Sequence, residues 1–259
     1  MNIQFHKYQG AGNDFILIDH RSSALKNIDN SLVKHLCDRR FGIGADGLMF
    51  LLSHADFDFE MVYYNADGNL GSMCGNGGRC IVAFAKQLGI IDREATFLAV
   101  DGPHYAKISA ESNWVELQMI DVDNITNDNN AFVLNTGSPH YVIETVDLAN
   151  MDVFTEGKAI RNNDTYRANG INVNFVENKG DHLFVRTFER GVEDETYACG
   201  TGVTAVAMSI AKKQNQIGSI ETPIKVLGGD IKINFDYDGS KFTNVFLCGP
   251  AEKVFDGTI

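Results

Sequence analysis

A short motif that occurs twice, about half a chain apart, constrains the fold of this 259-residue protein more than any other feature. Cys74-Gly-Asn-Gly and Cys199-Gly-Thr-Gly each open a segment of helical length that is apolar over most of its circumference. A helix that is apolar all round lies inside a structure rather than on its surface. We therefore predict two buried helices, from about Gly75 to Leu88 and from about Gly200 to Lys213.

The sequence before each motif is also repeated. Asn65 precedes Cys74 and Arg190 precedes Cys199 by the same number of residues, and both follow strand-like runs. A weaker helix is predicted over residues 31–39. Strand periodicity marks nine further segments, namely 3–8, 15–19, 48–52, 57–64, 104–110, 114–120, 183–188, 231–237 and 243–248.

These repeats predict an α+β fold with two pseudo-symmetric domains. Each domain is expected to be a mostly antiparallel β-sheet wrapped around a central buried helix, with the active site in the cleft between the domains. The first domain would span residues 1–120, completed by a C-terminal strand at about 249–259. The second would span 121–248, and the polar stretch 121–130 is predicted to be the linker between the two domains.

Charge and apolar patterning exclude several classes of protein. The chain has 22 Lys and Arg against 34 Asp and Glu, a net charge of −12, and no basic cluster, which argues against nucleic-acid binding. No apolar run reaches the roughly 18 residues of a membrane span, and the N-terminus lacks the apolar stretch of a signal peptide. Five cysteines, an odd number, then indicate reduced thiols and a cytoplasmic location.

A cysteine at a helix N-terminus is suited to proton transfer. The helix dipole and the first N–H groups favour the thiolate, and the same groups can bind a carboxylate. Two such thiols on opposite sides of a bound carboxylate could invert the neighbouring stereocentre, since one removes the α-proton and the other delivers a proton to the opposite face. The two helix N-termini would stabilise the charge that builds up on the carboxylate.

Other chemistries fit the cysteines less well. Zinc ligands occur at short spacings, and here only Cys74 and Cys80 are near each other. A dithiol redox pair would need Cys-x-x-Cys, which is absent. A cysteine hydrolase could pair Cys74 or Cys199 with His140, but the second motif would then have no role. The glycines after Cys74 match neither a dinucleotide-binding nor a phosphate-loop fingerprint. No metal or organic cofactor is therefore predicted.

The chain resembles the diaminopimelate epimerase family along its whole length. The segments that carry the resemblance begin at Gly10 (GAGNDF), Arg40 (RFGIGADG), Tyr64 (YNADG), Cys74 (CGNGGRC), Ser138 (SPH), Gly170 (GINVNF), Phe188 (FERG) and Ala198 (ACGTG). The resemblance implies a cofactor-independent isomerase that interconverts LL- and meso-2,6-diaminoheptanedioate in lysine and peptidoglycan synthesis. It also implies the duplicated fold, a small-molecule substrate as the main partner, and a homodimer.

The family's functional residues can be carried over position by position. Cys74 and Cys199 match the catalytic cysteines, and His140 and Glu189 match residues that adjust the pKa values of the two thiols. The remaining matches are substrate contacts, partly through backbone amides, at Asn13, Asn65, Gly75, Asn76, Asn172, Glu189, Arg190, Gly200 and Thr201. An arginine fork for a carboxylate and an acid for an ammonium suit a substrate that has both groups at each end.

The sequence also departs from the family pattern. Ser138 replaces a common Asn, Gly47 replaces a common Gln, and Phe255 stands where some members use a Tyr to dimerise; the acidic loop 193–195 is one residue longer than usual. These departures affect fine specificity and the dimer rather than the reaction type.

Plainer interpretations of single residues stay open. Asn13 and Asn65 could be turn residues, Glu189 and Arg190 could form a surface ion pair, and Cys80 reads as core. At the level of the whole protein, the alternatives are another cofactor-free amino acid racemase or epimerase on the same fold, and a non-catalytic amino-acid-binding protein.

Overall fold

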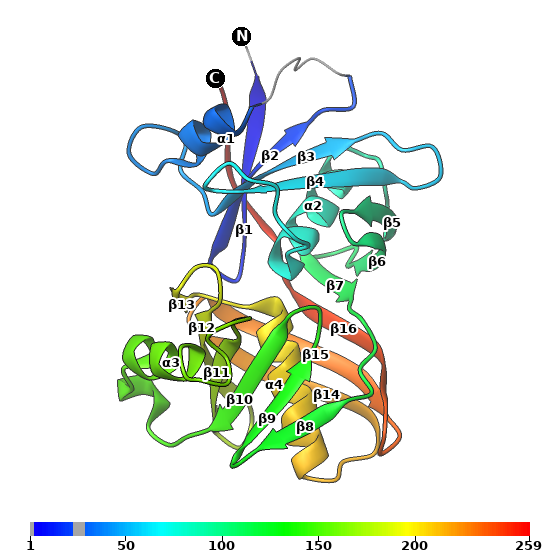
Figure 1. Ribbon diagram of the computed structural model, residues 1–259. Helices are drawn as coiled ribbons and strands as arrows, with labels where there is room; N and C mark the ends of the chain where they lie inside the picture. Colours follow the sequence, from blue (N-terminus) through cyan, green and yellow to red (C-terminus); the bar gives the residue numbers. More distant parts are fainter. Residues whose placement is uncertain (1–2, 23–28) are drawn as a thin grey trace. The chain divides into compact units, whose positions relative to one another are not determined.

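The computed structural model describes residues 3–22 and 29–259. Its contacts divide the chain into two compact units (Figure 1), one formed by Met1–Leu117 with Gly249–Ile259 and the other by Gln118–Cys248. Among the described residues, no helix combines the length and the apolar character needed to cross a membrane.

In the described part of the N-terminal unit, eight strands follow one another in the order β17-β1-β2-β3-β4-β5-β6-β7. Neighbours are antiparallel except for the parallel pairs β2–β3 and β4–β5. The strands are β1 (Gln4–Gly10), β2 (Asn13–Asp19), β3 (Gly47–Leu52), β4 (Phe59–Asn65), β5 (Glu94–Ala99), β6 (Gly102–Ile108), β7 (Trp114–Gln118) and β17 (Glu252–Thr258).

In the C-terminal unit, the strand order is β8-β9-β10-β11-β12-β14-β15-β16, and the short β13 pairs with β12. The parallel pairs here are β10–β11 and β12–β14. The strands are β8 (Ile125–Asp128), β9 (Ala131–Asn135), β10 (Pro139–Glu144), β11 (Asn172–Asn178), β12 (Leu183–Glu189), β13 (Asp194–Thr196), β14 (Gly218–Val226), β15 (Gly229–Tyr237) and β16 (Phe242–Pro250).

The two units repeat one topology. In both, an antiparallel pair leads into a parallel pair, then an antiparallel pair, a second parallel pair and two more antiparallel pairings. Within the described residues, each unit has an α-helix between the two strands of its first parallel pair and another between those of its second. The predicted α+β class and the predicted duplication are both confirmed.

Each sheet surrounds the helix that the repeated motif opens. Helix α2 (Gly75–Gln87) contacts β1, β2, β3 and β6, and helix α4 (Gly200–Lys213) contacts β9, β10, β11, β12 and β15 (Figure 1). Nearly every residue of both helices is buried, as predicted. Gly89 follows the end of α2 with a φ of +68°, a conformation that a glycine adopts without strain.

A second helix in each unit covers part of the sheet. Helix α1 (Asn30–Cys37), predicted over 31–39, begins after Asp29, whose side chain accepts a hydrogen bond from Leu32 N. It packs on Ile16 and Ile18 of β2. Because side chains alternate along a strand, the intervening Leu17 faces the other way, on the side of α2. Strand β2 is thus buried on both faces and reads as a continuous apolar run.

The sequence patterns predicted strands β12, β15 and β16 and helix α4 of the C-terminal unit and missed its other elements, among them helix α3 and strand β8. Helix α3 (Val153–Arg161), which follows the 3-10 helix η1 (Leu148–Asn150), buries only two of its residues, so its apolar stripe is too narrow to detect. The predicted linker at 121–130 contains strand β8. Ile125 of this strand is buried while Thr126 and Asn127 are exposed, and a polar strand of this kind is typical of a sheet edge.

Candidate functional site

Both cysteines of the repeated motif occupy the N-cap position of the central helix of their unit. Cys74 precedes α2 with φ −111° and ψ 118°, and Cys199 precedes α4 with φ −115° and ψ 109°. Their carbonyls accept the first helical hydrogen bonds, from Gly78 N at 2.7 Å and Val203 N at 3.0 Å. The two thiols therefore leave equivalent backbone positions, each beside the N–H groups of a first helical turn that favour negative charge.

A side chain packs closely on the last glycine of each four-residue motif. A Cβ added at Gly77 would lie 2.0 Å from Met49 Cε, and one added at Gly202 would lie 2.3 Å from Asn174 Oδ1. Contacts below 3.0 Å cannot be accommodated without movement. In both units, a side chain from a neighbouring strand thus presses on the first turn of the central helix.

Asn13 faces Cys74 in the N-terminal unit. Asn13 is the first residue of β2, and its Oδ1 accepts hydrogen bonds from Cys74 Sγ at 3.6 Å and from Asn76 Nδ2 at 3.3 Å. Asn76 is buried in the first turn of α2. The structure thus brings together three residues that the sequence placed in the site, and Asn13 is more than a turn residue.

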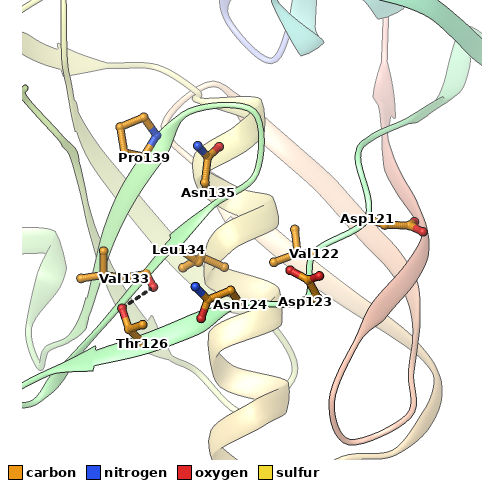
Figure 2. Close-up of a pocket in the computed structure, with 9 residues that line it drawn as sticks. All are labelled: Asp121, Val122, Asp123, Asn124, Thr126, Val133, Leu134, Asn135 and Pro139. Carbon is orange, nitrogen blue, oxygen red and sulfur yellow. Dashed lines mark hydrogen bonds between the residues drawn. The ribbon is translucent and has the colours of Figure 1, made fainter.

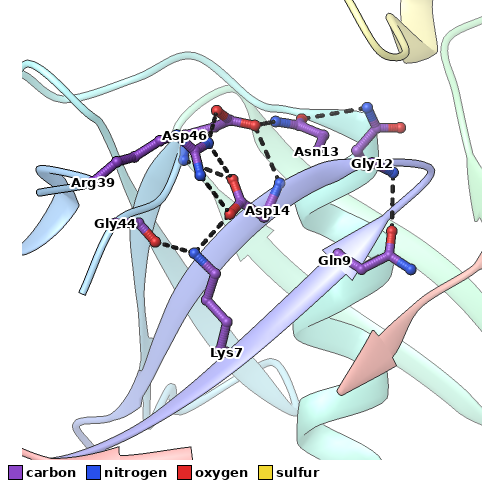
Figure 3. A network of polar contacts seen from close by, with 9 residues as sticks. Lys7, Gln9, Gly12, Asn13, Asp14, Arg39, Gly44 and Asp46 are labelled. Atoms are coloured by element: carbon purple, nitrogen blue, oxygen red, sulfur yellow. Dashed lines mark hydrogen bonds and ion pairs between the residues drawn. The ribbon is translucent and has the colours of Figure 1, made fainter. Parts of the chain in front are cut away.

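A network of charged side chains holds the other end of Asn13 (Figure 3). Asn13 Nδ2 donates to Asp46 Oδ2 at 2.6 Å, and Arg39 donates to Asp46 Oδ1 at 2.6 Å and to Asp14 Oδ1 at 2.7 Å. Lys7, which is 5% exposed, pairs with Asp14 at 2.7 Å and donates to the Gly44 carbonyl. Sequence reasoning missed these four charged residues, although Asp14 and Asp46 lie within segments that carried the family resemblance.

The network also sets the ionisation of Asp14. Burial by itself would raise the pKa of this carboxyl, but the hydrogen bonds and charges of Arg39 and Lys7 lower it to about 2. Asp14 is therefore ionised throughout the neutral range. It forms a fixed negative charge between two cations, and the Asp46 backbone N donates to it at 3.1 Å.

His140 and Thr201 lie behind Cys199 in the C-terminal unit. His140 Nε2 is 2.9 Å from Thr201 Oγ1, which in turn is 3.6 Å from Cys199 Sγ. On the other side of the ring, Nδ1 is 3.1 Å from Nδ2 of Asn174, a fully buried residue of β11. Sequence reasoning did not assign Asn174 to the site. The available signal was its spacing of two from Asn172, which puts both side chains on one face of a strand.

His140 is held in its neutral form. The side chain is fully buried, and this burial, together with the positive charge of Arg190, lowers the pKa of His140 from 6.5 to about 3. A neutral imidazole has one ring nitrogen that donates and one that accepts. His140 therefore works as a hydrogen-bonding group at neutral pH and not as a positive charge beside the thiol.

This shift predicts an acid-sensitive contribution to stability. Below about pH 6.5 the unfolded chain gains a proton on His140 that the folded protein takes up only near pH 3, so the free energy of unfolding falls as the pH is lowered through that window. Between about pH 6.5 and about pH 5, His140 should lower the free energy of unfolding by about 2 kcal/mol. Urea unfolding of wild type and His140→Gln at both pH values should show that the variant loses about 2 kcal/mol less. An equal loss in both proteins would contradict the assignment.

Asn172 and Arg190 lie together at the ends of β11 and β12. Asn172 Oδ1 accepts from Arg190 N at 2.8 Å, and its Nδ2 donates to the Pro139 carbonyl beside His140 at 3.1 Å. The exposed Arg190 side chain crosses the turn at Gly170 and donates to the Asn169 carbonyl at 3.2 Å. Asn172 thus connects the arginine to the segment that carries the histidine.

The remaining predicted residues lie at strand ends. Glu189, the last residue of β12, accepts a hydrogen bond from Thr196 Oγ1 at 2.9 Å. Asn65 is exposed at the end of β4, opposite Gly47 of β3. A Cβ added at Gly47 would lie 2.4 Å from the Tyr63 ring, so this ring occupies the space that a side chain at position 47 would need.

Two other features, Cys80 and a cavity, lie apart from the predicted catalytic and substrate-binding residues. Cys80 is fully buried in α2, and this burial raises the pKa of its thiol well above the usual value, in agreement with its assignment to the core. A cavity of about 320 Å³ in the C-terminal unit (Figure 2) is lined by none of the predicted site residues. Within residues 3–22 and 29–259, no group of three or more His, Cys, Asp or Glu side chains could hold a metal ion.

Comparison with known sequences identifies close relatives. The chain matches the family described as diaminopimelate epimerase over residues 5–123 and 132–254. The diaminopimelate epimerase of Flavobacterium psychrophilum is 50% identical over 258 residues, which cover 99% of this chain and 100% of the relative. That of Chlorobaculum tepidum is 41% identical over 259 residues, covering 96% of this chain and 98% of the relative.

Solved structures of more distant proteins share the fold. A phenazine biosynthesis protein of the PhzF family from Bacillus anthracis aligns with a TM-score of 0.77 at 13% identity, covering 100% of this chain and 99% of its own. A hydroxyproline epimerase from Agrobacterium vitis aligns with a TM-score of 0.72 at 12% identity, covering 100% and 92%. At these identities the likeness concerns the fold alone. The sequence matches extend over the whole chain, and by them this protein belongs to the diaminopimelate epimerase family.

Proposed function

We propose that this protein interconverts LL- and meso-2,6-diaminoheptanedioate without a cofactor, with Cys74 and Cys199 as the acid/base pair. The observation that carries the proposal is the equivalence of the two cysteines. Both are N-caps of the central helix in units of the same topology, with backbone angles that agree within about 10°. A non-catalytic binding protein would have no need of two reactive thiols at matched helix ends.

The reaction proposed is proton exchange at one α-carbon. A thiolate removes the α-proton from one face, and the thiol of the other cysteine delivers a proton to the opposite face, so that the configuration inverts and the two sulfurs exchange protonation states. The first N–H groups of α2, at Gly75 and Asn76, and those of α4, at Gly200 and Thr201, would bind the reacting carboxylate and stabilise the charge that develops on it. His140 and Glu189 would adjust the pKa values of the two thiols.

The second amino acid centre of the substrate would be bound by polar side chains at strand ends. Asn13, Asn65 and Asn172 supply neutral amides, Arg190 a guanidinium fork for the distal carboxylate, and Glu189 a carboxylate for the distal ammonium. In this proposal, residues 1–120 with 249–259 and residues 121–248 form the two domains that supply one cysteine each.

The experiment that tests this function is solvent isotope incorporation. The purified protein is incubated in deuterium oxide with LL-2,6-diaminoheptanedioate and a chelator, and with alanine, lysine and proline in parallel. We expect deuterium at one α-carbon and formation of the meso isomer only from the diamino diacid. Turnover of a single-centre amino acid instead would indicate another racemase of this fold. Binding without exchange would indicate a non-catalytic binder.

Two further parts of the proposal concern context. The activity would serve the synthesis of lysine and of peptidoglycan precursors, in the cytoplasm. We also propose a homodimer that forms through β17, because among the described residues of its unit this strand pairs with β1 alone, and it exposes Val254 (56%) and Phe255 (46%). An exposed apolar edge strand is a common protein–protein contact.

The dimer proposal predicts the effect of a charge on β17. Phe255→Asp should shift the protein from dimer to monomer, because a carboxylate in an apolar interface loses its hydration. Sedimentation velocity at several concentrations measures the shift. Val100→Asp, at an exposed turn of the same unit, is the matched control and should leave the dimer intact. Identical sedimentation of both variants would remove β17 from the interface.

A further inference from the structure

A row of hydrogen-bonding side chains leads from the core of the C-terminal unit to Cys199. Asn174 Nδ2 lies 3.1 Å from His140 Nδ1, His140 Nε2 lies 2.9 Å from Thr201 Oγ1, and Thr201 Oγ1 lies 3.6 Å from Cys199 Sγ. Asn174 and His140 are 0% exposed, so bulk water does not compete for these contacts. By geometry alone, either partner could donate in the contact between Thr201 and Cys199. The orientation of Asn174 decides between them.

The backbone fixes the orientation of the Asn174 amide. Its Nδ2 lies 3.0 Å from the carbonyl oxygen of Tyr141, which can only accept a hydrogen bond, so the NH₂ group must face that side. Its Oδ1 accepts a hydrogen bond from Thr187 Oγ1 at 3.0 Å. The amide nitrogen is therefore also the atom that faces His140, and it donates to Nδ1 of the ring.

The donor direction then follows along the row. A ring nitrogen that accepts carries no hydrogen, so the neutral imidazole of His140 has its hydrogen on Nε2. Burial of this ring and the charge of Arg190 hold the pKa of His140 at about 3, so it is neutral at physiological pH. Nε2–H donates to Thr201 Oγ1, and the hydroxyl hydrogen of Thr201 is left to point at the Cys199 sulfur.

We propose that Asn174 is a positioning residue for proton transfer at Cys199: by holding His140 in the Nε2–H tautomer, it makes the Thr201 hydroxyl the hydrogen-bond donor to the sulfur. The inference rests on the proposed function for the role of Cys199 in the reaction. A donor to sulfur stabilises the thiolate, which is the form that removes a proton.

The N-terminal unit offers its cysteine the opposite partner. Asn13 Nδ2 is committed to Asp46, so the amide oxygen is the atom that faces Cys74 and accepts its S–H. An acceptor stabilises the thiol form. The two cysteines thus share their backbone geometry but differ in these hydrogen-bond contacts, which favour the thiol form at Cys74 and the thiolate form at Cys199.

The first test reads the tautomer directly. Long-range ¹H–¹⁵N spectra of the uniformly ¹⁵N-labelled protein distinguish the two neutral tautomers and the charged ring, and His140→Gln identifies the signals of His140. We expect the Nε2–H tautomer in wild type, and a mixture of tautomers in Asn174→Ala. A wild-type ring with its hydrogen on Nδ1, or a doubly protonated ring, would overturn the proposal. This outcome does not depend on catalysis.

The second test follows the thiolate. Brief iodoacetamide labelling at neutral pH, read by peptide mass spectrometry, gives the ratio of Cys199 to Cys74 alkylation within one molecule. We expect Thr201→Val, which loses the hydroxyl, to lower this ratio about tenfold, and Thr201→Ser to keep it near wild type. Asn174→Ala should lower it severalfold. An unchanged ratio in Thr201→Val would overturn the proposal.

Controls separate this role from a structural one. Thr136→Val removes a hydroxyl of the same cluster that donates to the Thr201 carbonyl at 2.8 Å, and it should leave the ratio unchanged. Labelling of the buried Cys80 reports unfolding in any variant. The epimerase assay is made separately on wild type, where absence of turnover would refute the proposed function, while the tautomer and the labelling ratio would still judge the role of Asn174.

Discussion

Replacing either Cys74 or Cys199 by Ala should abolish epimerisation, with a loss well beyond the roughly 10²–10⁴-fold usually assigned to a single proton-transfer group. The physical reason is that inversion needs a base on one face of the α-carbon and an acid on the other. Neither cysteine is expected to supply both, because each is the N-cap of its own buried central helix. The measurement is the rate of meso isomer formation from LL-2,6-diaminoheptanedioate by chiral chromatography.

The control for this prediction is another buried cysteine. Cys37 lies at the end of α1, where burial raises the pKa of its thiol to about 11, so it stays protonated at neutral pH. Cys37→Ala makes the same chemical change away from both helix N-termini and should keep most of the activity. Near-normal turnover in either Cys74→Ala or Cys199→Ala would show that one thiol is enough, and the two-base mechanism would be wrong.

Arg190→Lys should lower kcat/KM for diaminoheptanedioate by about 10²-fold. Lysine keeps the positive charge but loses the planar fork that binds a carboxylate through two parallel hydrogen bonds, which are worth about 1.5–3 kcal/mol in similar sites. The structure gives the guanidinium a defined position, since Arg190 N is bound by Asn172 and its Nη1 by the Asn169 carbonyl. The variant should not gain activity on alanine or lysine, because nothing replaces the lost contact.

Arg161→Lys is the matched control. Arg161 lies beside the same turn at Gly170, but its guanidinium pairs with Glu193 at 3.2 Å. We expect this variant to turn over the diamino diacid at close to the wild-type rate. Steady-state kinetics of both variants on the three substrates decides the matter. If Arg190→Lys were as active as Arg161→Lys, Arg190 would bind no substrate carboxylate.

The sequence by itself determined the parts of this protein that depend on short-range pattern. The two central helices begin and end where the glycines and the apolar periodicity predicted, because a buried helix needs apolar residues on all sides. At the end of α2, Gly89 adopts the positive φ that ends the helix. The duplication was visible because Cys74 and Cys199 open equivalent segments. The family followed from motifs that keep both their order and their spacing.

Tertiary structure decided which polar side chains meet. Asn174 pairs with His140 only because β10 and β11 are parallel neighbours, and Asp46 meets Asn13 only because the chain returns beside β2 after α1. Such contacts join residues far apart in sequence, so no local pattern encodes them. The same holds for β8, where the single buried Ile125 gains its place from pairing with β9. The sequence located both thiols, and packing between strands decided that one faces a carbonyl oxygen and the other a hydroxyl.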